Sequence, residues 1–206
     1  MSKYMREKDH IITDQDSTLV SLCQKKDLAA FEELVRKHQQ KMLNIAYRMI
    51  GNYEEACDVV QDAFVSAYKN IKSFKGISKF STWLSVIVIN HSKKSLKKLK
   101  SQHYRESVSV YKTVNIGHNQ ISVDPPSSGP LPDEVIEREN IQEKLQLCLD
   151  RLENEFREVV VLRDIQGFSY KDISRTLTIA EGTVKSRLFR ARVLLKNCLK
   201  RFLGVI

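Results

Sequence analysis

The side chains best suited to specific chemistry lie near the carboxyl end of the chain, in the segment EGTVKSRLFRAR. Lys185 and Arg190 carry cations that can bond the edge of a guanine base. Ser186 can bond a phosphate, and Phe189 offers an apolar surface to a thymine methyl group. Arg187 flanks this group. On one face of a helix, these residue types predict contact with duplex DNA.

A second group of candidate side chains combines positive charge with aromatic rings in the middle of the chain. Lysines attract the backbone of a nucleic acid, and aromatic rings stack on unpaired bases. Core packing explains the rings of Phe80 and Trp83 equally well. The group comprises Phe74, Lys75, Lys79, Phe80, Trp83, Lys93 and Lys94.

The distribution of charge supports nucleic-acid binding. The 206 residues carry a net charge of +9, and no Asp or Glu occurs between Ala63 and Arg105. Residues 133–164 are acidic, and residues 165–206 are basic again. Two basic segments separated by an acidic one predict two docking places for a polyanion. A membrane surface is the other candidate, but the lysine-rich segment lacks the bulky aromatics of inserting helices.

The composition argues against several other classes of protein. The first residues are polar, unlike a signal peptide, and the longest apolar run, VIVI, is too short to span a bilayer. We therefore expect a cytoplasmic protein without direct membrane insertion. The four cysteines are scattered, so we expect reduced thiols and no metal site. Neither a catalytic constellation nor a cofactor motif occurs, which predicts no enzyme and no cofactor.

The elements that position the basic groups are predicted to be helices. Ser169 and Asp172 have the spacing of a capping box, which starts a short helix. A tight turn in TIAEG leads into a second helix with an apolar face, so the pair forms a candidate helix-turn-helix. The apolar positions on that face are Val184, Leu188, Ala191 and Leu195.

The rest of the chain is also predicted to be helical, which makes the fold class all-α. We expect a flexible tail over residues 1–16, with a helix cap at Ser17 or Thr18. One helical domain spans residues 17–100 and another spans residues 133–206. Residues 101–132 contain all four prolines and form the predicted flexible linker.

The C-terminal half resembles region 4 of sigma factors of the extracytoplasmic-function (ECF) type, within the sigma-70 family. The similarity is continuous from LDRLENEF to RARVLLK. In that family this domain reads the promoter −35 element, which implies contacts from Lys185, Ser186, Phe189 and Arg190. Considered alone, this half is also similar to the DNA-binding domain of LuxR-type regulators.

The N-terminal half resembles sigma region 2, through the segments DVVQDAFVSAY and FKGISKFSTWL. The resemblance implies that Asp58, Gln61, Asp62 and Phe64 dock on the β′ clamp helices of core RNA polymerase. It implies that residues 74–83 capture an unpaired base of the −10 element. Cys57 stands where many relatives have an acid, and the segment after Asn90 departs from the family pattern. These departures leave the detailed −10 preference open.

The combined resemblance implies a sigma factor that binds core polymerase, including the β-subunit flap, and directs it to promoter DNA. It also implies control by an anti-sigma factor, which in this family is often membrane-anchored. The alternative is a stand-alone helix-turn-helix transcription regulator. That alternative accounts for residues 165–206 but leaves the polymerase-like segment unexplained.

Overall fold

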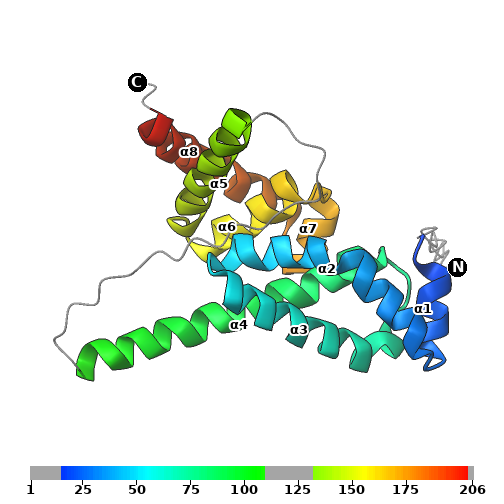
Figure 1. Cartoon of the computed structure of the whole chain (residues 1–206). Helices are drawn as coiled ribbons and strands as arrows, with labels where there is room; N and C mark the ends of the chain where they lie inside the picture. Colours follow the sequence, from blue (N-terminus) through cyan, green and yellow to red (C-terminus); the bar gives the residue numbers. More distant parts are fainter. Residues whose placement is uncertain (1–14, 110–131, 204–206) are drawn as a thin grey trace, which may run out of the picture.

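We analysed a computed structural model, which describes residues 15–109 and 132–203. Within these two ranges the secondary structure is helical and contains no strand, which confirms the all-α prediction. Most of the predicted linker lies outside the described residues. The elements, shown in Figure 1, are α1 (Ser17–Gln24), α2 (Leu28–Ile50), α3 (Tyr53–Asn70), the 3₁₀ turn η1 (Ile71–Ser73), α4 (Phe80–Ser109), α5 (Pro132–Asp150), α6 (Asn154–Val160), the π turn η2 (Val161–Ile165), α7 (Tyr170–Leu177) and α8 (Glu181–Leu203).

Helices α1 to α4 form the N-terminal part, in which α2, α3 and α4 pack against one another. Asp27 caps α2 by accepting a hydrogen bond from the backbone N–H of Ala30. Gly51 ends α2 in the left-handed region, at φ 82°, where a residue without Cβ is favoured. Asn52 then caps α3 through the N–H of Glu55. Two adjacent residues, Gly51 and Asn52, therefore define where α2 ends and where α3 begins.

Helix α4 settles two points that the sequence left open. The run VIVI is helical, as predicted, and its Val88 and Ile89 face the core. The helix continues to Ser109, beyond the predicted end of the domain at residue 100. No described helix is long and apolar enough to cross a membrane.

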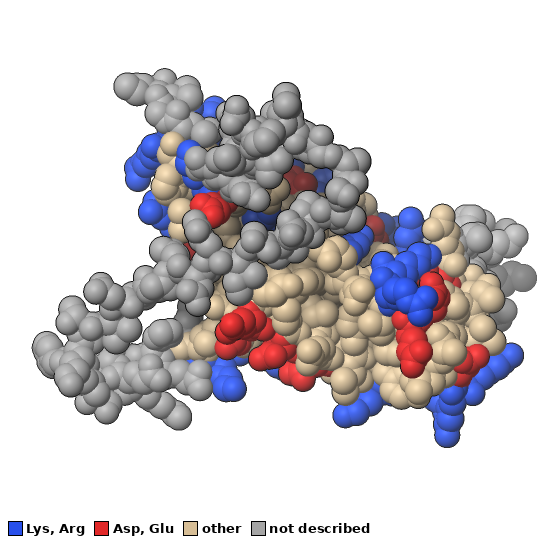
Figure 2. Space-filling view, viewed as in Figure 1, with Lys and Arg blue, Asp and Glu red and all other residues tan. Residues whose placement is uncertain are grey.

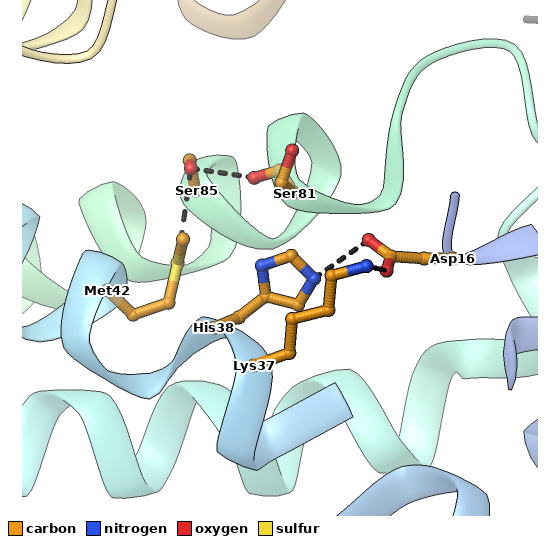
Figure 3. A network of polar contacts seen from close by, with 6 residues as sticks. All are labelled: Asp16, Lys37, His38, Met42, Ser81 and Ser85. Carbon is orange, nitrogen blue, oxygen red and sulfur yellow. Dashed lines mark hydrogen bonds and ion pairs between the residues drawn. The ribbon is translucent and has the colours of Figure 1, made fainter. Parts of the chain in front are cut away.

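The N-terminus of the fold differs from the expected flexible tail. Asp16 is buried and is the N-cap residue of α1, although its side chain makes no capping bond, so Ser17 and Thr18 are not caps. Its carboxylate instead lies 2.8 Å from Nε2 of His38 and 2.5 Å from Nζ of Lys37, as Figure 3 shows. The tail prediction is wrong at Asp16 because two groups of α2 satisfy this acid inside the fold.

Helices α5 to α8 form the C-terminal part, and here the cysteine prediction is wrong. Cys148 of α5 and Cys198 of α8 form a disulfide, with Cα atoms 5.8 Å apart. These residues are separated by 50 positions, and only the packing of α5 on α8 brings them together. Cys23 and Cys57 are free thiols, as predicted.

The two parts touch directly, through contacts of α2 with α5, α6 and η2 and of α4 with α7. Figure 1 shows α2 running beneath α6 and α7. The buried Arg157 of α6 donates one hydrogen bond to the backbone oxygen of Met49 and another to that of Asp150. We call this contact the junction; its principal side chains are those of Arg48, Lys93, Gln142, Gln146, Asp150, Arg157 and Glu158.

Candidate polymerase and nucleic-acid interfaces

The helix-turn-helix is built as the sequence predicts. The hydroxyl of Ser169 caps α7 by accepting from the N–H of Asp172, at 3.1 Å, and also donates to the Asp172 carboxylate. Helix α7 ends at Leu177, and the next residue, Thr178, adopts the left-handed conformation and turns the chain toward α8. Four α8 side chains face the core: Val184, Leu188, Ala191 and Leu195.

The opposite face of α8 presents the predicted base-reading side chains to solvent. Lys185, Ser186, Phe189 and Arg190 are all exposed, and Phe189 is 71% exposed. An aromatic ring with that exposure does not belong to the core. This face therefore offers two cations, a hydroxyl and an apolar ring on one helix surface.

Three of the predicted side chains already have partners in this structure. Ser186 donates its hydroxyl to the backbone oxygen of Thr183, so its oxygen remains able to accept. The ammonium of Lys185 lies over the ring of Tyr170. Arg187 turns back toward α6, where it pairs with Glu155 at 2.7 Å and with Glu158 at 3.6 Å. Arg187 is therefore the least available of the DNA contacts predicted on α8.

The aromatic loop before α4 forms one cluster. The rings of Phe74, Phe80 and Trp83 lie within 6.0 Å of each other between centroids. Phe80 is fully buried, whereas Phe74 and Trp83 are partly exposed. The side-chain amide of Gln24 donates to the backbone oxygens of Ile71 and Phe74, which ties this loop to α1. The exposed rings thus have a fixed support.

Lysines surround that cluster and continue along α4. Lys75, Lys79 and Lys94 are exposed. Lys41 of α2 is half-buried near them, and burial together with the charge of Lys79 lowers its pKa. Lys93 pairs with Glu158 of α6 at 2.7 Å, so the junction occupies one of the predicted DNA contacts.

The predicted polymerase contacts lie on α3. Asp58, Gln61 and Asp62 are exposed on one side of the helix. Phe64 is buried and packs edge-to-face against Phe31, so its place in this structure is the core. Figure 2 shows acidic side chains gathered over the beginning of α3. The three exposed side chains form an acidic and polar surface that is separate from the basic ones.

No local pattern in the sequence predicts the junction. Arg157 and Glu158 lie in the otherwise apolar segment FREVVVL. Their charge would place them on the solvent-exposed face of a helix. In the structure both are buried, and Glu158 pairs with one base from each part of the chain, Lys93 and Arg187. A buried charge is retained where a partner of opposite charge compensates it.

The junction also shifts three pKa values, and burial is the largest cause of each, including the lowering at Arg48. Burial raises the pKa of Asp150 above its ordinary value, against the lowering influence of Arg157 and Arg48. Burial lowers the pKa of Arg157, and Asp150 opposes that change. Desolvation therefore outweighs pairing here, which is typical of charges brought out of water at an interface.

The described residues contain no group of three His, Cys, Asp or Glu side chains that could hold a metal ion. Three surfaces stand out among the described residues: the cationic and aromatic face of α8, the aromatic and lysine surface at the start of α4, and the acidic surface on α3. Most of the predicted site residues lie on these surfaces, whereas Phe64 and Phe80 are buried.

Comparisons with known proteins agree with this arrangement. The family models for Sigma-70 region 2 and Sigma-70, region 4 match residues 34–102 and 142–195. The chain is 33% identical to the RNA polymerase sigma-H factor of Pseudomonas aeruginosa, over 92% of this chain and 96% of that protein. It is 34% identical to the ECF RNA polymerase sigma factor SigW of Bacillus subtilis, over 85% of this chain and 92% of that protein.

Solved structures show the same fold. The sigma factor RpoE from Bartonella quintana, in complex with the anti-sigma factor NepR, matches with a TM-score of 0.63 and 25% identity, over 82% of this chain and 96% of that one. CnrH, in complex with the cytosolic domain of CnrY, matches with a TM-score of 0.62 and 23% identity, over 91% of this chain and 99% of that one.

Proposed function

The chain belongs to the ECF group of sigma-70 factors, and from that premise we propose that it binds core RNA polymerase and directs it to promoters with matching −10 and −35 elements. The polymerase supplies the chemistry, and this chain supplies recognition. We place its work in the cytoplasm, where promoters and polymerase meet.

The observation that carries the proposal is the exposed face of α8. Lys185, Phe189 and Arg190 project from a helix whose other face is locked into the core by Val184 and Leu188. A recognition helix needs this division, because the buried face fixes its angle while the exposed face enters the major groove. We assign the −35 element to this surface.

We assign the opened −10 strand to the aromatic loop and the start of α4. Trp83 and Phe74 offer partly exposed rings, and Lys75 and Lys79 offer charge along one side. Single-stranded DNA is held by this pairing of stacking and positive charge. Phe80 supports the two rings from within the core.

We propose that the α3 surface binds the β′ clamp helices of the polymerase and that the C-terminal part binds the β-subunit flap. Reversing Asp58 and Asp62 to Lys should lower the affinity for core polymerase, because both carboxylates face solvent and a basic partner would be repelled. Native gel shifts with core enzyme measure this. Unchanged assembly by the double variant would remove α3 from the interface.

The direct test of the whole proposal is run-off transcription with core polymerase on a library of promoters. We expect transcripts only from templates that carry a preferred pair of elements. A chain that binds duplex DNA but never supports transcription would instead be a stand-alone regulator. Two solved relatives in fold are held by other proteins, RpoE by NepR and CnrH by CnrY. We propose that an anti-sigma factor controls this chain as well.

A further inference from the structure

Among the described side chains of helix α5, those of residues 141–150, the buried ones lie near its C-terminal end. Among its described side chains only Gln146, Cys148 and Leu149 are buried, whereas Ile141 and Leu147 are largely exposed. An element with so few buried apolar groups opens easily on its own. The covalent bond from Cys148 to Cys198 lies within the last turn of α5, so it forms a large share of the attachment of α5 to α8.

The same turn of α5 reaches the N-terminal part. Arg48 of α2 donates to Gln146 at 3.1 Å and also to Gln142. The Asp150 carboxylate lies so close to Gly51 that a Cβ there would meet its oxygen at 2.7 Å. The disulfide therefore fixes a helix that touches α8 on one side and α2 on the other.

We propose that Cys148 and Cys198 form a reversible thiol–disulfide site, oxidised by hydroperoxides, whose oxidised state holds α5 against both α8 and the junction. The Cα separation of 5.8 Å lies within the range that a disulfide requires. The proposal rests on the proposed function in one respect. A protein that works in a reducing compartment keeps a disulfide as a redox-responsive bond rather than as a permanent one.

The chemistry proceeds in two balanced steps. Cys198 is partly exposed, while Cys148 is buried, so the Cys198 thiol meets the hydroperoxide first. It becomes a sulfenic acid as the peroxide O–O bond breaks and one water or alcohol leaves. The Cys148 thiol then attacks the sulfur of Cys198, the S–S bond forms, and a second water leaves. A dithiol reductant returns both thiols by exchange.

The first test is chemical and uses the full-length protein. Reduced protein is treated with hydrogen peroxide, free thiols are blocked with an alkylating reagent, and peptides are identified by mass. We expect a Cys148–Cys198 peptide that disappears with dithiothreitol, and alkylated Cys23 and Cys57 in both states. Absence of the linked peptide after oxidation would overturn the proposal.

The second test measures the structural effect by hydrogen exchange of the oxidised and reduced wild-type protein. Reduction should speed exchange several-fold in α5, in the second half of α8 and in the last turn of α2, and leave α3 unchanged. It should also lower the melting temperature of the C-terminal part by about 10 °C. Equal exchange in both states would show that the bond holds nothing in place.

Two variants serve as checks on these measurements. Cys198→Ser should match the reduced wild type and lose all response to oxidant, while Cys57→Ser, which changes a free thiol, should behave as the wild type. Neither readout involves DNA or polymerase. A failure of the redox site is therefore distinguishable from a failure of the proposed function.

Discussion

Arg190 and Lys185 occupy the exposed face of α8 with different surroundings. Arg190 has no ion-pair partner among the described residues, whereas Lys185 lies over Tyr170. A residue that reads a base edge through two hydrogen bonds contributes discrimination of about 1–3 kcal/mol at one base pair. A residue that contacts phosphate affects all sequences alike.

We expect Arg190→Ala to lose preference at one −35 position, and Lys185→Ala to weaken all promoters more evenly. The measurement is transcription from templates with single −35 substitutions, repeated at several salt concentrations. Removal of a lysine that contacts phosphate lowers the slope of log affinity against log salt concentration by about one. Wild-type discrimination in both variants would show that another surface reads this element.

Gly51 combines two demands that only glycine meets here. Its φ is 82°, and a Cβ would lie 2.7 Å from the carboxylate of Asp150. Gly51→Ala should therefore lower the free energy of unfolding by about 1–2 kcal/mol, as measured by urea denaturation. Gly76→Ala is the matched control, because Gly76 has φ 70° but nothing within 4 Å of the added Cβ. If both variants lose the same amount, the approach of Asp150 is unimportant.

At the scale of elements, α1 is attached to α2 through the carboxylate of Asp16. Burial raises the pKa of Asp16, but hydrogen bonds from Lys37 and His38 and their charges outweigh it, so the pKa lies below its ordinary value. A carboxyl with a lowered pKa in the folded state stabilises the fold above its unfolded pKa. That stability is lost as pH falls through the folded value.

Asp16→Asn should cost about 2 kcal/mol at neutral pH, because it removes hydrogen bonds between charged groups. The difference from the wild type should shrink as the pH falls below 3.8, the ordinary value for this carboxyl. Thermal denaturation of both proteins at a series of pH values measures this. A difference that stays constant on acidification would mean that Asp16 acts without its charge.

Helices were predictable from the sequence because each one carries a local signal. The spacing of Val184 and Leu188 indicates a helix, and Ser169 with Asp172 indicates where one starts. The exposed face of α8 follows from the same spacing. The burial of Phe64 and Phe80 was harder to predict, because an aromatic residue in a binding motif can equally well belong to the core.

Contacts between residues far apart in the chain could not be predicted from the sequence. The bond between Cys148 and Cys198 and the contact between Arg157 and Met49 each depend on how whole helices pack. Composition predicted reduced thiols by compartment, and no local pattern opposed that prediction. Asp16 was missed for a related reason, because its partners lie on α2, more than a helix away.

At the scale of the whole molecule, the junction holds the two parts together, whereas the proposed recognition of two promoter elements requires them apart. The −10 and −35 elements are named for positions that lie about 25 base pairs apart. At ~3.4 Å per base pair, this separation is on the order of 80 Å of duplex. In this structure α2 contacts α5 and α6, which keeps the two parts close together. We therefore expect formation of the proposed promoter complex to include opening of the junction.

Arg48→Ala should favour the open form, because Arg48 binds Gln142 and Gln146 across the junction. Loss of about 1 kcal/mol shifts an equilibrium roughly fivefold. We expect a larger radius of gyration by small-angle X-ray scattering. Arg36→Ala is the control, since Arg36 pairs with Glu33 within the same helix and faces solvent. Identical scattering from both variants would mean that Arg48 does not hold the parts together.

Glu158 acts as a built-in counter-ion that a phosphate of bound DNA would have to replace. Its buried carboxylate is a tethered counter-anion for Lys93 and Arg187, one base from each of the two helices to which we assign DNA contacts. A promoter phosphate that reaches either base must displace this carboxylate. Added salt weakens the new phosphate contact and the old carboxylate contact together, so the two effects partly cancel. Affinity for promoter DNA should therefore fall less steeply with salt than the number of phosphates contacted implies.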